Sequence, residues 1–344
     1  MASLITLADI QAAAARISGV AVRTGLYPVS PERLRAAGVA ELPFELYLKA
    51  ESEQPIGSFK LRGAYNRIAQ LTPEELKRGV ITYSSGNHAQ GVAYAARALG
   101  ANAVIVMPGD APAVKIEATR ALGAEVVLVG PASSERKAKA EELAEAHGYA
   151  VIPPYDDPAI IAGQGTCGLE IVEQLGLGPQ EGVVVLSPVS GGGLLGGIST
   201  AIKLGMPAGT TIQVWGAEPE LAADAKQSFD TRTLVEWPAA KTTRTISDGL
   251  RTQSLGALNF EHILRFVDGI VTVTEDEIVA AMRVLLAATG LVAEPSGAVT
   301  MAAALYHHAE LPKCARMVAV LSGGNIEPEL RQRLESGVGT GASG

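Results

Sequence analysis

The sequence predicts an α/β fold in which parallel strands are covered by helices on both faces. Short apolar runs recur along the chain, and each is followed by a turn of small residues and then by a segment with helical periodicity. The runs are apolar throughout rather than alternating, which is typical of strands buried on both faces. The length of 344 residues, with 47% hydrophobic and 19% charged residues, supplies more than one core.

The expected elements follow one another in a regular order. The strands of the first half are rich in Val and Ile, and turns containing Gly, Pro or Asn precede their helices. In the second half, each apolar run ends at a turn rich in glycine or proline. We expect strands at 80–83, 103–107, 125–129, 183–186, 211–215 and 317–321, and helices at 90–99, 114–122, 135–146 and 194–204.

These units fall into two groups, which predicts two domains. Residues 82–157 form a small domain, closed by a proline-rich turn cluster at 153–158. Residues 1–81 and 158–344 form a large domain, into which the small lobe is inserted. We expect a cleft between the two.

Composition excludes several classes of function. The net charge of −8 offers no basic excess for a nucleic-acid backbone, and aromatic residues are only 4%. No uninterrupted apolar stretch is long enough to span a membrane, and the N-terminal stretch lacks the features of a secretory signal. Two cysteines cannot form a disulfide framework, which suits a reducing compartment. We therefore expect a cytoplasmic protein without a nucleic-acid or membrane partner.

The sharpest motif is a glycine-rich turn that begins at Ser190 and runs through Gly191, Gly192 and Gly193 into a helix. Converging backbone N–H groups and the partial positive charge of a helix N-terminus make an anion cradle, so the turn favours phosphate binding. The spacing Gly191-x-Gly193-x-x-Gly196 also satisfies the dinucleotide fingerprint, with Glu218 at the end of the next strand as a ribose-binding acid. The turn alone does not choose between the two ligands.

A second candidate is Lys60, which we place in the first turn of a helix after a Pro/Gly turn. The helix dipole disfavours a cation there and lowers the pKa of the amine, which suits a lysine that forms a Schiff base. Two further loops follow strands: 84–88, with the sequence Ser-Ser-Gly-Asn-His, could hold a carboxylate, and 322–325 places Ser322 where it could donate to a neutral ring nitrogen. An ordinary helix cap and a simple glycine turn are the structural alternatives for these loops.

Taken together, these segments resemble the fold type II pyridoxal 5'-phosphate (PLP) enzymes, the tryptophan synthase β-like group. Within that group they are most similar to threonine/serine dehydratases and serine racemase. The resemblance is carried, in family order, by motifs at 57–63, 84–88, 162–166, 190–193, 272–277, 294–297 and 321–325.

The resemblance implies a cofactor site in the large domain. Lys60 would carry PLP as a Schiff base, with Phe59 packed beside the ring. Further contacts would come from Asn87 at the phenolic oxygen, from Ser190, Gly191, Gly192, Gly193 and Leu194 at the phosphate, from Ser322 at the pyridine nitrogen, and from Gly249 and Glu294 around the ring.

It also implies a substrate and a metal site. Ser84, Ser85, Asn87 and His88 would bind the substrate, with Ser85 as a second base opposite Lys60 and Arg136 closing the lobe. Glu218, the carbonyl of Ala222 and Asp224 would bind a divalent cation such as Mg²⁺ or Mn²⁺, although two surface acids are the simpler reading of that spacing. A homodimer is the family expectation.

The expected reaction is α,β-elimination from L-threonine, L-serine or a related β-hydroxy amino acid, which yields a 2-oxo acid and ammonia. A serine-type racemase on the same scaffold is one alternative, and an NAD-dependent oxidoreductase built on the glycine fingerprint is the other. The loops after Pro154 and around Thr245 should shape the pocket for the β-substituent, and their sequence carries no readable preference among threonine, serine, 3-hydroxyaspartate and phenylserine.

Overall fold

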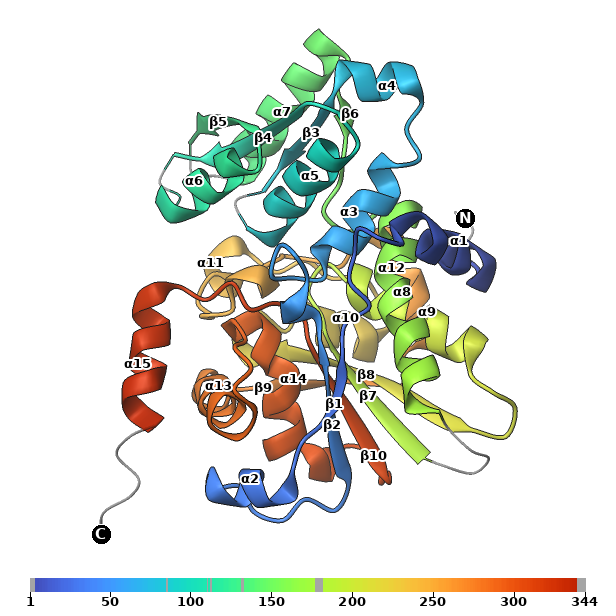
Figure 1. The fold of residues 1–344 in the computed structure, drawn as a ribbon, viewed down its shortest axis with the longest axis vertical. Helices are drawn as coiled ribbons and strands as arrows, with labels where there is room; N and C mark the ends of the chain where they lie inside the picture. The colour runs from blue at the N-terminus through green and yellow to red at the C-terminus, as the bar shows by residue number, and fades with distance from the viewer. Residues whose placement is uncertain are drawn as a thin grey trace.

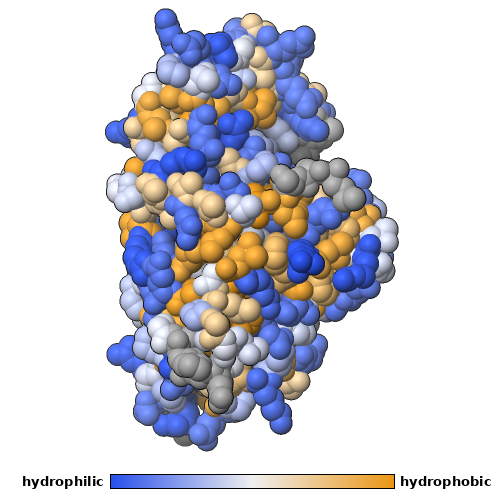
Figure 2. Space-filling model, turned by 90° about the vertical axis from the view of Figure 1, so that its right-hand side faces the viewer, coloured by the Kyte–Doolittle hydropathy of each residue, from blue (hydrophilic) through white to orange (hydrophobic). Residues whose placement is uncertain are grey.

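The computed structural model describes residues 4–84, 86–109, 111, 113–130, 133–176 and 182–338, and of residues 114, 133, 134, 337 and 338 the backbone alone. Two sheets lie one above the other in Figure 1. None of the described helices is long and apolar enough to cross a membrane. Viewed from the side, the surface mixes hydrophilic and hydrophobic side chains, with apolar atoms gathered towards the middle (Figure 2).

The larger sheet has six strands in the order β1-β2-β10-β7-β8-β9. All neighbours pair in parallel except β1 and β2, so the predicted parallel sheet carries one antiparallel edge strand. The strands are β1 (Leu26–Pro28), β2 (Glu45–Ala50), β7 (Gly182–Pro188), β8 (Thr211–Pro219), β9 (Gly269–Val273) and β10 (Arg316–Leu321).

The smaller sheet is wholly parallel, in the order β5-β4-β3-β6. It comprises β3 (Val80–Tyr83), β4 (Ala103–Pro108), β5 (Glu125–Val129) and β6 (Ala150–Val151), with helices α4 (Pro73–Arg78), α5 (Asn87–Ala98), α6 (Ala113–Ala121) and α7 (Ser133–His147). The sequence-based boundary between 81 and 82 falls inside β3. The boundary between 157 and 158 falls at Asp157, which caps the helix that follows. The division into two domains remains a prediction.

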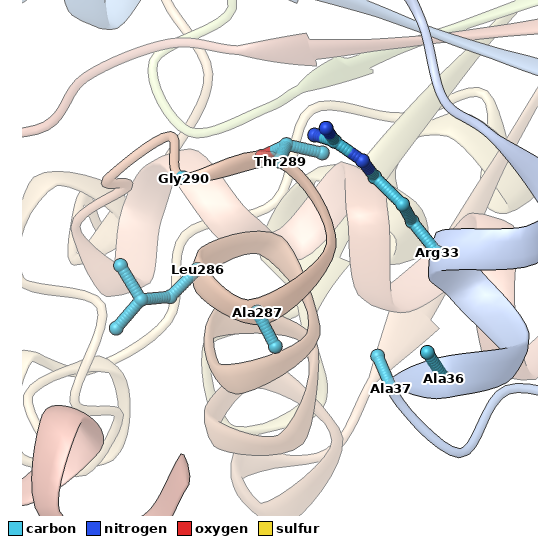
Figure 3. Close-up of a pocket in the computed structure, with 7 residues that line it drawn as sticks. All are labelled: Arg33, Ala36, Ala37, Leu286, Ala287, Thr289 and Gly290. Atoms are coloured by element: carbon cyan, nitrogen blue, oxygen red, sulfur yellow. The ribbon is translucent and has the colours of Figure 1, made fainter.

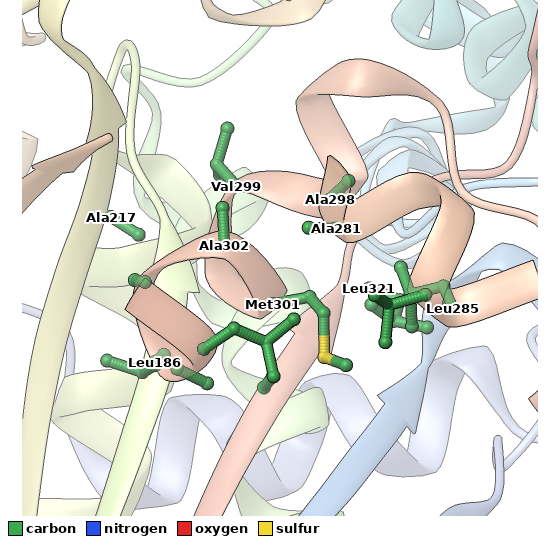
Figure 4. Packing of buried hydrophobic residues seen from close by; sticks show 14 of the residues in the cluster. Leu186, Ala217, Ala281, Leu285, Ala298, Val299, Met301, Ala302 and Leu321 are labelled. Atoms are coloured by element: carbon green, nitrogen blue, oxygen red, sulfur yellow. The ribbon is translucent and has the colours of Figure 1, made fainter. Parts of the chain in front are cut away.

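Helices cover both faces of the larger sheet, as predicted. On one face α14 (Pro295–Tyr306) packs against the strands and α13 (Glu275–Thr289) packs against α14, and Figure 4 shows Met301 and Val299 of α14 among the buried side chains there. On the other face lie α8 (Pro158–Leu175) and α9 (Gly193–Gly205). The remaining helices are α1 (Leu7–Ile17), α2 (Pro31–Ala36), α3 (Lys60–Ile68), α10 (Asp224–Thr231), α11 (Ala239–Thr242), α12 (Ala257–Phe266) and α15 (Pro328–Val338), with single 3₁₀ turns η1 (Glu51–Glu53), η2 (Glu220–Ala222), η3 (Asp248–Leu250) and η4 (His308–Glu310).

Three helices pack backbone to backbone through glycines, which fixes the position of their N-termini. A Cβ atom at Gly163 of α8 would lie 2.6 Å from the Cα of Gly63 in α3. A Cβ atom at Gly197 of α9 would lie 2.5 Å from the carbonyl oxygen of Ile161 in α8. Real Cβ atoms do not approach so closely, so only glycine permits this packing of α3 on α8 and of α8 on α9.

Candidate active site

Three segments that are far apart in the sequence meet beyond the end of β10. Ser58 forms an isolated β-bridge with Gly323, and the Phe59 N–H donates to the carbonyl of Ser322 at 3.0 Å. Asn87, at the start of α5, lies against Gly323, since a Cβ atom there would be 3.2 Å from the Asn87 amide nitrogen. The ends of parallel strands are the usual ligand sites of open α/β sheets.

Lys60 is the first residue of α3 and its side chain is partly buried. Its ammonium donates to the Pro154 carbonyl at 2.8 Å and lies 5.2 Å from the centre of the Phe59 ring. Burial lowers the pKa of Lys60 to about 8. The direction agrees with the sequence-based expectation, and desolvation is the cause. An amine with this pKa is half neutral near pH 8 and can act as a nucleophile or a base.

The glycine turn opens α9 without a side-chain cap, because Gly192 holds the N-cap position with φ of +93°. The backbone N–H groups at the start of α9 are therefore available to a ligand. The Gly191 carbonyl accepts hydrogen bonds from the Asn259 amide at 2.6 Å and from the Gly256 N–H at 3.0 Å. Within one peptide unit the C=O and the following N–H point in opposite directions, so these bonds also orient the N–H of Gly192.

Two side chains support this turn from either side. The Ser190 hydroxyl pairs with that of Thr252 at 2.7 Å. A Cβ atom at Gly191 would overlap the ring of Tyr155, so glycine is required where the ring packs. Burial, followed by repulsion from Tyr83, raises the pKa of Tyr155 to about 12, and its hydroxyl stays protonated. Tyr155 was not among the residues predicted to form the site.

Asn87 and Glu294 are joined by a hydrogen bond of 2.6 Å from the Asn87 amide to the Glu294 carboxylate. Glu294 is 5% exposed at the N-cap of α14. Burial, and then repulsion by Asp248, raises the pKa of Glu294 to about 8. Gly249 lies close by, because its N–H donates at 2.9 Å to the hydroxyl of Ser296, two residues after Glu294.

The loops after β3 and β10 differ in the hydrogen-bonding groups that they leave available to a ligand. Ser322 is 4% exposed, and its hydroxyl donates to the Ser296 carbonyl at 3.4 Å, a long bond that leaves the hydroxyl available to a better acceptor. The Ser84 hydroxyl accepts from the Gly86 N–H at 3.4 Å. His88 is buried, and its Nε2 donates to the Ile152 carbonyl at 3.0 Å.

The contacts of His88 do not support its predicted role in gripping a substrate carboxylate. Burial, and then the nearby Lys60, lowers the pKa of His88 to about 3, so the ring is neutral and serves the packing of α5. Ser85 lies outside the described residues. Arg136 lies in the first turn of α7, beside β3 and β4, and its role in closing the site remains a prediction.

The predicted metal ligands lie at the end of β8. The two oxygens of buried Glu218 accept from the N–H groups of Ala225 at 3.1 Å and Lys226 at 2.9 Å, so the carboxylate caps α10. Asp224 is 1% exposed, and its Oδ2 is buried without a hydrogen-bond partner. Burial raises the pKa of Asp224 to about 7, and burial with repulsion from Asp224 raises that of Glu218 far above its usual value. Ala222 is buried in η2 between them.

The chemistry of this carboxylate pair suits a divalent cation. Two buried acids repel each other, and an orphaned oxygen remains for a ligand, so the residues fit a hard divalent ion. No group of three or more His, Cys, Asp and Glu side chains able to hold a metal occurs among the described residues, so backbone carbonyl or water oxygens would have to complete the coordination.

A surface pocket of about 370 Å³ lies elsewhere, between α2 and the end of α13. Figure 3 shows Arg33 on one wall and Thr289 and Gly290 on the other. None of the residues predicted to bind cofactor or substrate lines it, so we place the chemistry at Lys60 and not in this pocket.

A family model decides the nature of the site. The model described as a pyridoxal-phosphate dependent enzyme matches residues 27–323. The chain belongs to this family. The glycine cradle, the uncapped start of α9 and the Lys60 amine fit a phosphorylated aldehyde without further side chains.

The relatives of this PLP-dependent enzyme perform elimination or racemisation. L-threo-3-hydroxyaspartate ammonia-lyase of Saccharomyces cerevisiae is 39% identical over 293 residues, which are 85% of this chain and 86% of the relative. Serine racemase of Schizosaccharomyces pombe is 37% identical over 326 residues, 95% of this chain and 96% of the relative. The crystal structure of a T.th. threonine deaminase is 44% identical with a TM-score of 0.84, and the match covers 94% of this chain and 99% of that one.

These comparisons confirm the fold type II PLP fold and a PLP-dependent ammonia-lyase. The dinucleotide alternative is not supported, because Glu218 caps α10 with both oxygens instead of facing a ribose. Tyr155, Asn259 and Asn325 also support the site but were not predicted to belong to it; Tyr155 and Asn325 lie in loops, and Asn259 lies in α12. Asn325 stands in the motif at 321–325, and Tyr155 stands in the turn cluster at 153–158.

Proposed function

We propose that this PLP-dependent enzyme eliminates water from a small β-hydroxy amino acid, L-threonine, L-serine or L-threo-3-hydroxyaspartate, and releases ammonia and a 2-oxo acid. The observation that carries the proposal is Lys60, a partly buried amine of lowered pKa in the first turn of α3, next to the loop that ends β10. The names of the relatives support the substrate class, since they include a hydroxyaspartate ammonia-lyase and a threonine deaminase.

The cofactor, when bound, supplies an electron sink for the α-carbon of the amino acid. The glycine turn and the start of α9 hold its phosphate, and Asn87 donates to its phenolic oxygen. Ser322 would offer the ring nitrogen an uncharged hydroxyl, which would favour a neutral nitrogen. The Lys60 amine would take the α-proton at Nζ, and the β-hydroxyl would leave as water once protonated by the bound phosphate or by an acid near it.

A divalent cation on Glu218, Asp224 and the Ala222 carbonyl is the second part of the proposal. Its support is the buried, unpartnered Oδ2 of Asp224 and the raised pKa values of both acids. The cation would neutralise the pair and tie the end of β8 to α10, a structural role that we place outside the chemistry.

Racemisation of the same amino acids is a second candidate activity, favoured by the 37% identical serine racemase. Ser85 would supply the proton on the face opposite Lys60. Replacement Ser85→Ala should then reduce racemisation and turnover of D-substrates much more than elimination from L-substrates. Equal losses would remove Ser85 from this role. The homodimer and the cytoplasmic location remain sequence-based expectations, of which sedimentation equilibrium would test the first.

Two measurements test the proposed function. Ammonia release across a panel of β-hydroxy amino acids, with and without EDTA, should show elimination from threonine, serine or hydroxyaspartate and reveal any dependence on metal. Reduction of the holoenzyme with borohydride, followed by peptide mapping, should place the pyridoxyl label on Lys60. A label on another lysine, or no label, would refute the assignment.

A further inference from the structure

Asn325 ends the Ser-Gly-Gly-Asn motif after β10 and has no role in the proposed function. Its side-chain N–H groups donate to the Ile56 carbonyl at 2.9 Å and to the Asn87 Oδ1 at 2.7 Å. Its Oδ1 occupies the space that a Cβ atom of Gly57 would need, so the amide is packed directly on the glycine backbone. Gly57 has φ of +71°, a conformation that excludes most other residues as well.

The direction of this hydrogen-bond chain is fixed at the end where Asn325 meets the Ile56 carbonyl. A backbone carbonyl only accepts, so the amide nitrogen of Asn325 must face Ile56. At the other end, the Glu294 Oε1 accepts from the Asn87 amide nitrogen at 2.6 Å. Asn87 therefore turns its oxygen towards Asn325 and its nitrogen towards Glu294.

An asparagine amide has nearly the same shape in its two flipped orientations, so packing alone does not choose between them. The choice matters for Asn87. One orientation offers N–H donors to an oxygen anion, and the other offers a carbonyl oxygen that repels it. A donor to the Asn87 oxygen selects the first orientation, and Asn325 is the residue that supplies this donor.

We propose that Asn325 is a positioning residue that sets the orientation of the Asn87 amide, so that a hydrogen-bond donor faces the phenolic oxygen of the cofactor. The inference rests on the proposed function, in which Asn87 contacts that oxygen. It requires no contact between Asn325 and either cofactor or substrate.

The test is the substitution Asn325→Asp, because aspartate has the same shape but its carboxylate only accepts. The new carboxylate would draw the Asn87 amide nitrogen towards itself and leave the Asn87 oxygen facing the cofactor. The readout is the visible absorption of the holoenzyme without substrate, where the ratio of two bands reports whether the phenolic oxygen is ionised or protonated. Loss of a charge-assisted hydrogen bond should shift this ratio towards the protonated form by about tenfold.

The same substitution in a protein that lacks the Asn87 amide tests whether the effect depends on Asn87. In the Asn87→Ala protein there is no amide to orient, so Asn325→Asp should leave the band ratio of Asn87→Ala unchanged. An equal shift in both backgrounds would show that the new carboxylate acts through its charge, and would overturn the inference. Asn325→Leu, an apolar residue of similar shape, replaces the aspartate variant if that variant does not fold, and should produce a smaller shift that also requires Asn87.

The outcomes separate this inference from the proposed function. A wild-type protein that shows no cofactor absorption refutes the proposed function. A wild-type protein with the expected absorption, together with an Asn325→Asp variant whose band ratio is unchanged, refutes the positioning role alone.

Discussion

Replacement of Arg62 by methionine should be among the most destabilising single changes in the chain. The guanidinium is completely buried two residues after Lys60, and it is held by two carboxylates. Its Nε and Nη2 donate to Glu51 at 2.7 and 2.8 Å, and its Nη1 and Nη2 donate to Glu170 at 2.6 and 2.9 Å. Lys49 is also bonded to Glu170, so two cations balance two anions.

Methionine retains most of the aliphatic volume but leaves a net negative charge in the interior. Removing one partner of a buried ion pair costs about 3–5 kcal/mol, because the remaining charge loses its compensation. That loss raises the unfolding equilibrium constant by roughly 10² to 10³·⁵-fold. Burial alone would raise the pKa of Glu51, and at present the Arg62 guanidinium outweighs burial and holds the pKa below its usual value. Without Arg62 the pKa of Glu51 should rise, and part of the lost stability should return as the pH is lowered.

Urea unfolding followed by circular dichroism and tryptophan fluorescence measures the free energy of unfolding, with coincident transitions as the check on cooperativity. The matched control is Arg23→Met, because Arg23 pairs with Glu173 at 2.5 Å with both side chains more than half exposed. An exposed pair contributes at most about 1 kcal/mol. A loss for Arg62→Met as small as that for the control would refute the reasoning from burial.

Three further predictions follow from the site. Asp224 has a raised folded-state pKa of about 7, so the metal-free folded protein keeps the Asp224 proton between about pH 4 and 7, whereas the unfolded chain loses it. The free energy of unfolding should therefore fall as the pH rises through that range. Calorimetry should show that Mg²⁺ reverses this fall and that Asp224→Asn flattens it, and an Asp224→Asn protein with the wild-type pH profile would contradict the assignment. In the apoenzyme, the rate at which an amine-specific reagent labels Lys60 should be half-maximal near pH 8, and a midpoint near 10.5 would show that the amine is not desolvated. Gly191→Ala drives a Cβ atom into the Tyr155 ring and should weaken PLP binding, measured by fluorescence titration, by at least about tenfold. Gly182→Ala is the control, because a Cβ atom there has nothing within 4 Å, and it should leave the PLP affinity unchanged. Equal PLP affinities of the two variants would exclude a tight fit at the turn.

The strands that the sequence predicts are those whose apolar runs are continuous. β4 and β10 are buried along nearly their whole length, so composition alone reveals them. β2 and β9 were not predicted. β2 mixes Glu45 and Lys49 with apolar residues, and the buried Lys49 ammonium is paired with Glu170 of α8, a partner that no local pattern reveals.

The residues of the candidate site likewise fall into those that local sequence predicts and those that only long-range contacts reveal. Lys60 and the glycine turn stand at junctions where local geometry and chemistry coincide, and both could be read from the sequence. Tyr155 and Asn259 are ordinary loop and helix residues whose importance arises from long-range contacts with Gly191. The role of His88 at the substrate carboxylate, which the resemblance implies, remains a prediction, and the long-range bond of its Nε2 to the Ile152 carbonyl could not be read from the sequence.

The glycine contacts among α3, α8 and α9 have a mechanical consequence. At Gly63 and Gly163, and at Gly197 and Ile161, the main chains themselves touch, so one helix cannot slide on the next without a clash between backbones. The amine at the start of α3 and the turn at the start of α9 are therefore held on one stiff frame. We therefore expect any movement that admits a substrate to involve the four-stranded sheet and its helices, and the frame to keep its geometry.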